Sequence, residues 1–296
     1  MPGKRPGNRP GDRALLTCDA RPVLAGGFRL AEGPVWDAPR ERLLWVDIEA
    51  GLVHEGRLRP ARVEVVRRHR LPGTVGAVAC AADGRLLVAG RHGLTVLLPD
   101  GTRRAGARVL AAGTPGRLND GGCDPAGRFL VGSAALDGRR GGDVLVRLAG
   151  DGRPRVLDTD LTCSNGLAWS PDGRLMYSVD TGSGRVRVRG YGPDGRTGPR
   201  RDLLAVGDGL PDGLCADRDG NLWLAVWGAG EVRCYSPAAR HLATVRVPAA
   251  YPSSAAFAGP GLDTLLISAG GPDGGLFAAR PGARGAALRA WDGVSR

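Results

Sequence analysis

Short apolar runs occur in pairs along this chain, and a turn separates the two members of each pair. In "NGLAWSPDGRLMYSVD" (165–180), the runs GLAW and LMYSV flank the tripeptide Pro-Asp-Gly. An Asp-Gly pair between apolar runs favours a hairpin, because glycine adopts the positive φ that a tight turn needs. The segment therefore predicts two antiparallel strands. Related segments begin at Glu32, Val75, Asp120, Asp212 and, in a more degenerate form, Ser253.

The copies of this pattern are evenly spaced. Their second residues are at positions 33, 76, 121, 166, 213 and 254, so successive copies are 43, 45, 45, 47 and 41 residues apart. A period of this length, with about four strands per unit, is typical of a β-propeller blade. Stretches between the copies, such as "LTVLLPDG" and "RVRVRGYGPDG", would supply the outer strands. No segment keeps the long helical period of about 3.6 residues.

These features predict an all-β fold, a six-bladed β-propeller with about four short antiparallel strands per blade. The stretches "RPVLAGGF" (21–28) and "GLFAAR" (275–280) are expected to share one blade, so that N- and C-terminal strands close the ring. Residues 14–296 would form this single propeller domain. Residues 1–13, "MPGKRPGNRPGDR", are basic and rich in Gly and Pro, and we expect them to form a flexible arm.

Composition and charge limit the possible partners. The net charge is +11, but Lys4 is the only lysine among 41 basic residues, and the arginines are spread along the sequence. They do not form the concentrated stripe that is typical of nucleic-acid binding. No apolar run reaches the length of about 18 residues that a membrane helix needs, and the first residues lack the apolar core of a signal peptide. We therefore expect a cytoplasmic protein with no nucleic-acid or membrane partner, and either a monomer or a dimer.

The cysteines and histidines indicate no site of their own. The six cysteines show no spacing typical of metal binding and are expected to be reduced thiols. The four histidines lie outside the repeated pattern and are expected on the surface or on outer strands. No Ser-His-Asp or Cys-His arrangement is evident.

One position of the repeat is polar where an apolar residue would be expected. It is occupied by Glu32, Asp120, Asn165 and Asp212 in four of the six copies. Rotation about the propeller axis relates the blades, so these side chains would converge on one mouth of the central channel. Three carboxylates repel one another unless a cation lies between them, which predicts a divalent ion with oxygen ligands. The alternative is that Asn and Asp before Gly are ordinary turn formers.

At these residues the sequence resembles the gluconolactonase/regucalcin family of six-bladed propeller lactonases, also called the senescence-marker-protein family. The resemblance extends from "LAEGPVWD" (30–37) to the sixth copy of the repeat. Its most specific pieces are "EGPVWD", "RLNDGGCDPAGRF" (117–129), "SNGLAWSPDGRLMY" (164–177) and "LPDGLCADRDGNLWLA" (210–225). Each piece alone would be weak, but the four occur in order and at the spacing of blades.

The resemblance implies a set of site residues. Glu32, Asn165 and Asp212 would bind one catalytic divalent metal ion, Ca²⁺, Mg²⁺, Mn²⁺ or Zn²⁺, with water completing its shell. Asn119 would contact the substrate, and Arg117 would hydrogen-bond a sugar-acid ligand. Asp212 would also act as the acid/base. The implied substrate is a sugar lactone or a related small lactone, which is hydrolysed to the hydroxy acid.

This chemistry suits the residue types. A bound metal polarises the lactone carbonyl and positions water for attack. A carboxylate such as Asp212 takes a proton from that water and returns it to the leaving alkoxide. Asp120 is expected either to support a neighbouring blade or to bind a second ion.

The loop after the third copy departs from the family pattern. Related enzymes commonly carry "GTM" and an acidic residue there, whereas this chain has "GSAALDGRRGG" (132–142). Asp137 would stand in for that acid and contact the substrate. Arg139 and Arg140 would either favour an acidic or phosphorylated lactone or be ordinary solvated arginines.

Other functions stay open at this point. The same metal site could hydrolyse an aryl ester or an organophosphate as a side reaction. A non-catalytic propeller, either a calcium-binding regulator or an interaction scaffold, is the alternative from another class. A scaffold of the WD type is disfavoured because the dipeptide at 36–37 and 291–292 does not recur with the repeat.

Overall fold

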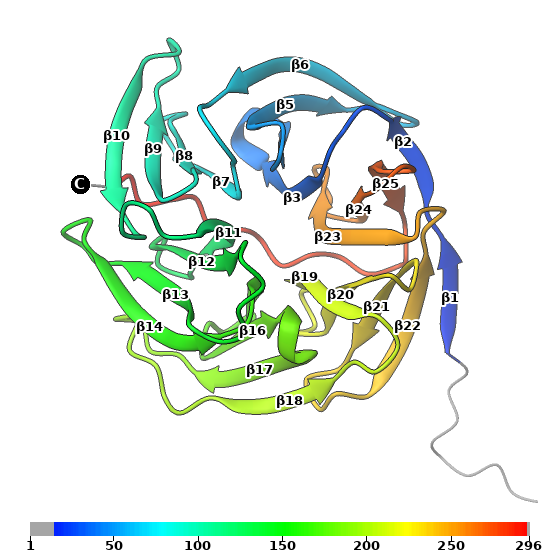
Figure 1. Cartoon of the computed structure of the whole chain (residues 1–296). Coiled ribbons are helices and arrows are strands. Elements are labelled where there is room, and N and C mark those ends of the chain that lie inside the picture. Colours follow the sequence, from blue (N-terminus) through cyan, green and yellow to red (C-terminus); the bar gives the residue numbers. More distant parts are fainter. Residues whose placement is uncertain (1–14, 295–296) are drawn as a thin grey trace, which may run out of the picture.

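Six sheets of β-strands stand around a common axis in the computed structural model of the chain (Figure 1). The structure describes residues 15–294, so the expected arm at 1–13 lies outside the described residues. The six-bladed propeller expected from the repeat is confirmed. Within 15–294, no helix is long and apolar enough to cross a membrane.

Each blade is built on consecutive antiparallel strands, and the first of them lies nearest the axis. Blade 1 comprises β3 (Ala31–Asp37), β4 (Arg42–Asp47), β5 (Leu52–Leu58) and β6 (Val63–Arg70). Blade 2 comprises β7 (Ala77–Cys80), β8 (Leu86–Ala89), β9 (Gly93–Leu97) and β10 (Arg103–Arg108). Blade 3 comprises β11 (Gly116–Cys123), β12 (Phe129–Ala135), β13 (Asp143–Leu148) and β14 (Pro154–Leu161). Blade 4 comprises β15 (Ser164–Trp169), β16 (Leu175–Asp180), β17 (Arg185–Gly190) and β18 (Arg201–Ala205). Blade 5 comprises β19 (Leu210–Ala216), β20 (Leu222–Trp227), β21 (Glu231–Tyr235) and β22 (His241–Arg246). Blade 6 comprises β23 (Tyr251–Ala258), β24 (Thr264–Gly270) and β25 (Gly275–Ala279). Two short 3₁₀ turns, η1 (Ala38–Arg40) and η2 (Thr181–Ser183), follow β3 and β16.

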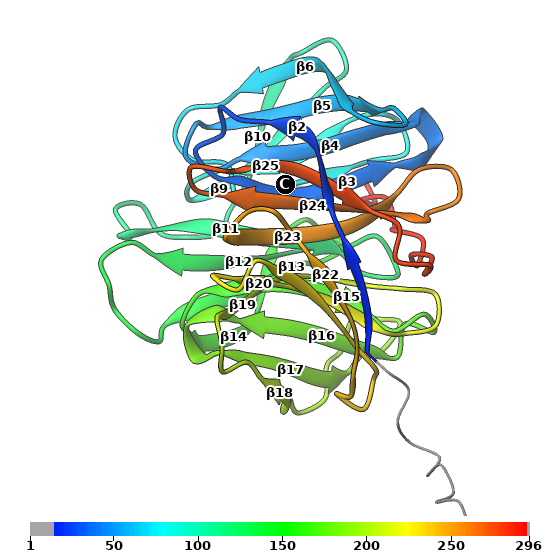
Figure 2. The same ribbon diagram turned by 90° about the vertical axis from the view of Figure 1, so that its right-hand side faces the viewer.

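The N-terminal strands close the ring. Strand β2 (Arg21–Ala25) pairs antiparallel with β25 and completes blade 6, as the sequence predicts. Strand β1 (Leu16–Asp19) runs parallel to β22 and adds a fifth strand to blade 5. The chain therefore ties two neighbouring blades together before it begins the first repeat (Figure 2).

The hydrophobic core is divided among the contacts between blades. Six buried clusters occur, and each one joins the facing sides of two neighbouring blades. Inner strands are covered on both faces, so strands such as β8 and β24 are buried throughout rather than alternating between buried and exposed residues. The fourth strands face solvent, and β6 and β10 are largely exposed.

The innermost strands are irregular where they begin. In β3 the pairing register slips between Glu32 and Val35, and in β15 it slips between Asn165 and Leu167. Equivalent slips occur near the starts of β11, β19 and β23. A β-bulge turns a side chain out of the regular alternation. Because Asn165 and Asp212 lie within strands, a simple turn-forming role does not explain them.

The C-terminal segment crosses the opposite end of the ring (Figure 1). Its backbone bonds the far ends of innermost strands, from Trp291 N to Cys80 O at 2.8 Å and from Ala286 N to Ala216 O at 3.2 Å. Trp291 is buried between blades 2 and 3. The bulged ends of the innermost strands therefore form the other mouth of the channel.

Candidate functional site

Three carboxylates lie together at the bulged mouth. Glu32 on β3 and Asp212 on β19 are each 6% exposed, and Asp120 on β11 is half-buried. Burial and the charge of Asp120 raise the pKa of Glu32 to about 8. Burial raises the pKa of Asp120 to about 6. Burial and the charges of Glu32 and Asp120 raise the pKa of Asp212 well above its ordinary value. Each acid thus disfavours ionisation of its neighbours, as expected for carboxylates that share one desolvated site.

Backbone groups hold two of these carboxylates in place. Glu32 Oε2 accepts a hydrogen bond from Gly33 N at 2.8 Å, and Asp120 Oδ1 accepts one from Gly121 N at 2.7 Å. The glycine in the "EG" and "DG" pairs therefore supplies a donor at the bulge. In blade 4 the glycine has a second purpose, because a Cβ on Gly166 would meet Asp212 O at 2.6 Å. The small residue lets adjacent innermost strands approach one another around the mouth.

Asn165 is oriented by a chain of hydrogen bonds. Its Nδ2 donates to Thr181 Oγ1 at 3.1 Å, and Thr181 Oγ1 donates to Pro211 O at 2.8 Å. Because the hydroxyl proton goes to Pro211, the Thr181 oxygen must accept from the amide nitrogen of Asn165. The amide oxygen of Asn165 is then directed away from Thr181. The same hydroxyl anchors the backbone immediately before Asp212.

Two oxygen atoms at this mouth have no hydrogen-bond partner. Among the described residues, Asn165 Oδ1 and Asp212 Oδ1 are both buried and unpaired. A buried acceptor without a partner costs about 1–3 kcal/mol, so such atoms call for an explanation. A cation would satisfy both oxygens and would remove the repulsion among the carboxylates. Oxygen donors suit a hard ion such as Ca²⁺, Mg²⁺ or Mn²⁺.

The amide is essential to this fit. Within 15–294, no three His, Cys, Asp or Glu side chains form a metal-binding group by themselves. A cation at the mouth would therefore need Asn165 Oδ1 beside Asp212 and Glu32, with water completing its shell. With the Asn165 amide oxygen included among the ligands, the residues present fit an oxygen-ligated divalent ion.

Arg117 supplies the positive charge of the site. Burial lowers its pKa, while Cys163, Glu32 and Asp212 act in the opposite direction. An arginine stays protonated under these conditions. Its guanidinium donates to Asn119 Oδ1 and, at 3.2 Å, to Leu118 O.

Asn119 links two blades and orients Arg117. Its Nδ2 donates to Ser164 O at 2.8 Å and contacts Cys163 Sγ at 3.7 Å, while its Oδ1 accepts from Arg117. Both ends of the amide are therefore engaged by the protein. Direct contact of Asn119 with substrate stays a prediction.

Asp137 lies apart from these groups. It is on the exposed loop after β12, where its carboxylate pairs with Arg139 at 3.2 Å. Arg140 Nη2 donates to Gly182 O at 2.6 Å. The loop arginines thus have partners within the protein, and substrate contact by Asp137 stays a prediction.

Ser253, the sixth member of the repeated position, bonds Ala31 O and Ser268 Oγ and joins blade 6 to blade 1 instead of facing the carboxylates.

Sequence reasoning missed Thr181 and Cys163. Thr181 follows the second strand of blade 4, where no repeated polar position marks it. Cys163 immediately precedes β15 and has a positive φ of 84°, and burial raises the pKa of its thiol to about 12. The thiol is therefore neutral and forms part of the wall beside Arg117. Only its position directly before "SNG" could have suggested this.

Comparison with known sequences places the chain in a family. Residues 30–271 match the SMP-30/gluconolactonase/LRE-like region. The chain belongs to this family. The resemblance drawn from the four motifs is thereby confirmed.

Sequence relatives agree with this assignment, and a solved structure shares the fold. The chain is 34% identical over 258 residues to pentonolactonase XacC of Haloferax volcanii, with 85% of each sequence covered. It is 35% identical over 245 residues to the 6-deoxy-6-sulfogluconolactonase of Pseudomonas putida, with 81% of this chain and 82% of that sequence covered. The structure of a calcium-binding protein, regucalcin, from Agrobacterium tumefaciens is 24% identical and shares the fold, with a TM-score of 0.84 over 94% of this chain and 99% of that one.

Proposed function

We propose that this family member is a divalent-metal-dependent lactonase that opens a small sugar lactone to the hydroxy acid. The observation that carries the proposal is the pair of unpartnered buried oxygens, Asn165 Oδ1 and Asp212 Oδ1, beside Glu32 and close to Arg117. Names of relatives, a pentonolactonase and a sulfogluconolactonase, support a sugar lactone as the substrate class. The description of the structural neighbour regucalcin as a calcium-binding protein supports a divalent ion as the cofactor.

Each residue has a distinct task in this reaction. Glu32, Asn165 and Asp212 would hold the ion, which supplies a Lewis acid for the lactone carbonyl and for water. Asp212 accepts a proton from the attacking water and returns it to the alkoxide that leaves when the ring C–O bond breaks. Arg117 donates to the substrate and pairs with the carboxylate formed on ring opening. Asn119 keeps the Arg117 guanidinium in position through its Oδ1.

The test is proton release from a panel of sugar lactones. The protein is stripped with a chelator, and Ca²⁺, Mg²⁺, Mn²⁺ or Zn²⁺ is then restored one at a time. We expect hydrolysis above the spontaneous rate only with metal, and its loss in Asp212→Asn and Glu32→Gln. Direct calorimetric titration of the same ion into each variant separates lost binding from lost chemistry.

Two outcomes would contradict the proposal. If every lactone stays at the spontaneous rate while the ion demonstrably binds, the mouth is a non-catalytic metal site or serves another ester. If hydrolysis persists at the wild-type rate after complete removal of metal, the ion has no catalytic role.

A further inference from the structure

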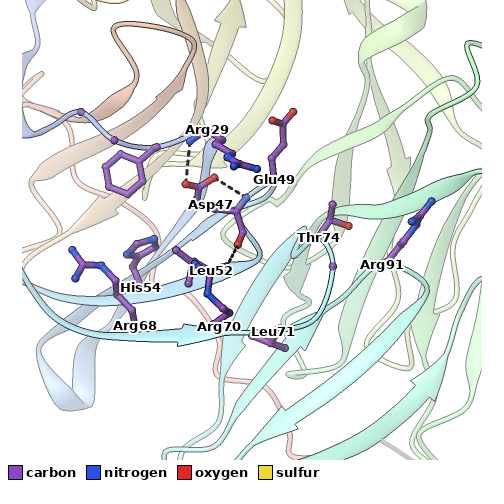
Figure 3. Close-up of a pocket in the computed structure, with 15 residues that line it drawn as sticks. Arg29, Asp47, Glu49, Leu52, His54, Arg68, Arg70, Leu71, Thr74 and Arg91 are labelled. Carbon is purple, nitrogen blue, oxygen red and sulfur yellow. Dashed lines mark hydrogen bonds between the residues drawn. The ribbon is translucent and has the colours of Figure 1, made fainter.

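A hollow separate from the carboxylate cluster lies on the mouth side of blade 1, where blade 1 meets blade 2. Its volume is about 650 Å³, within the range of small-molecule sites. The turn between β4 and β5, the loop before β3 and the link from β6 to β7 surround it (Figure 3). Nothing in the lactonase mechanism uses this hollow.

The hollow is lined by four arginines from three separate segments of the chain. They are Arg29, Arg68, Arg70 and Arg91. None of these side chains takes part in an ion pair between described residues, whereas many other arginines of the chain do. Arg70 has one internal partner, the carbonyl of Ala50 at 3.1 Å. Four guanidinium groups without carboxylate partners form a strongly positive surface.

The acids of the hollow offset only part of this charge. Asp47 and Glu49 are the two carboxylates in its lining. Both oxygens of Asp47 are already engaged by backbone N–H groups, those of Arg29 and Leu30 at 3.0 Å each. Ala50 N also donates to Asp47 at 3.3 Å. The four arginines and two carboxylates together give the lining a net positive charge. Figure 3 labels these six residues.

One wall is a neutral aromatic surface with unused polar atoms. His54 is 3% exposed, stacks on Trp45 with 5.0 Å between ring centroids, and meets the edge of Phe28 at 5.3 Å. Both of its ring nitrogens are buried and lack partners among the described residues, as does Thr74 Oγ1 on the opposite side. Burial and the charge of Arg68 lower the pKa of His54 to about 4, so the ring is uncharged near neutral pH. Buried polar atoms without partners are uncommon unless something binds there.

The hollow adjoins the carboxylate mouth. Arg91 O accepts a hydrogen bond from Leu118 N at 2.8 Å, directly beside Arg117. A Cβ on Gly76, two residues after Thr74, would meet Asn119 O at 2.5 Å. The charge of Glu49 also acts on Arg117. A ligand with one end at the mouth could therefore extend its other end into the hollow.

We propose that this hollow is an anion subsite, in which Arg29, Arg68, Arg70 and Arg91 hold a phosphate, sulfonate or carboxylate carried by the lactone away from its ring carbonyl. This inference rests on the proposed lactonase function and names its substrate class as anionic sugar lactones. Anionic oxygens match the arginine donors through charge-assisted hydrogen bonds. The paired arginines of the loop after β12 do not contribute to this selectivity.

The experiment measures binding separately from turnover. Metal-loaded protein is titrated calorimetrically with 6-phosphogluconate, gluconate and inorganic phosphate. The same titrations use the double variant Arg29→Gln/Arg68→Gln and the control Arg57→Gln, an exposed arginine of β5 outside the hollow. Among residues 15–294 the side chains of Arg29 and Arg68 make no hydrogen bond or ion pair, so their replacement by glutamine removes no such interaction. Thermal unfolding checks that both variants keep the stability of the wild type.

We expect wild-type protein to bind 6-phosphogluconate about tenfold more tightly than gluconate, the effect of one or two charge-assisted contacts. The ratio should fall to near one in the double variant and stay at the wild-type value in Arg57→Gln. KM for the 6-phosphorylated lactone should show the same dependence. The inference is overturned if wild-type protein does not distinguish the two sugar acids, or if the double variant keeps the preference. Inorganic phosphate that binds as tightly as the sugar phosphate would also overturn it, because the sugar would then add nothing.

Failure of the two proposals can be told apart. A binding preference that the double variant removes, in a protein that hydrolyses no lactone, would keep the subsite and reject the lactonase. Hydrolysis of neutral and phosphorylated lactones with equal kcat/KM would keep the lactonase and reject the subsite.

Discussion

Replacement of Thr181 by valine tests how the site sets the orientation of Asn165. The change keeps the shape of the side chain but removes the hydroxyl that accepts from Asn165 Nδ2 and donates to Pro211 O. Nothing would then determine which end of the Asn165 amide faces the carboxylates. In the flipped orientation Nδ2 would meet any cation at the mouth, where an oxygen is needed.

The size of the effect follows from these two hydrogen bonds. Leaving the Asn165 donor and the Pro211 carbonyl without partners should lower the free energy of unfolding by about 1–3 kcal/mol, because both residues are buried. Loss of a group that orients a metal ligand typically lowers metal affinity about 10- to 100-fold. Asn165 is the one proposed ligand whose side chain hydrogen-bonds Thr181 among the described residues, so we expect the loss of affinity to act mainly through the amide. The bond to Pro211 O, next to Asp212, is the second route by which the change reaches the site.

The assays are calorimetric titration of Ca²⁺ or Mn²⁺ and urea unfolding of the metal-free protein. Thr181→Ser keeps the hydroxyl and serves as the matched control, with an affinity expected within about threefold of wild type, well inside the 10- to 100-fold loss expected for valine. If the valine variant binds metal as tightly as wild type, the amide is oriented by something else and the reasoning is wrong. Equal loss of affinity in both variants would likewise refute it, because the hydroxyl would then be irrelevant.

Two further predictions concern stability. Gly166→Ala should lower the free energy of unfolding by about 1–3 kcal/mol in thermal melts, because its methyl group would lie 2.6 Å from Asp212 O. Gly122→Ala, whose nearest neighbour is 3.9 Å away, is the control, and equal melting temperatures for the two variants would count against close packing at the mouth. The pKa of Glu55 is lowered from 4.5 to about 2, and the hydrogen bond from His69 is the largest cause. Ionised Glu55 therefore stabilises the fold fully above pH 4.5, and this stabilisation is lost as the pH falls toward 2. This contribution to the free energy of unfolding is at most about 3 kcal/mol. In urea unfolding at pH 3 and pH 6, Glu55→Gln should show a smaller difference in stability between the two pH values than the wild type. An unchanged difference would contradict the role given to Glu55.

The repeat made the blades predictable. Inner strands are buried on both faces, so their apolar runs are strong and recur with each blade, and turn glycines such as Gly84 and Gly173 have the positive φ that the Asp-Gly pairs indicate. Symmetry about the axis then identified Glu32, Asp120, Asn165 and Asp212 as neighbours. The fourth strands were harder to place, because they face solvent and carry little apolar pattern.

The remaining features depend on contacts that no local pattern records. A bulge changes which way Asn165 points without changing the residues around it. Thr181 acts through a hydrogen bond to the next blade, and the arginines of the hollow lie on three separate segments of the sequence. The parallel pairing of β1 with β22 joins segments from opposite ends of the chain. Such relations follow from the placement of blades in space, which propensity alone does not determine.

Closure of the ring by β2 and β25 imposes an order on folding. Blades 1 to 5 each receive their four consecutive strands from one stretch of chain, so they can form in turn as the chain is synthesised. Blade 6 cannot, because β2 is among the first strands made and β25 is the last. At ordinary rates of synthesis β2 would wait roughly 10–50 s for its partner. During that time both edges of the growing arc remain open to pairing with other chains, a known route to aggregation. In refolding of the complete chain, the same pairing joins residues as far apart as Arg21 and Ala278 and so closes a very long loop. We therefore expect the sixth blade to be the last to acquire amide protection during refolding, and the yield of native protein to fall as its concentration rises.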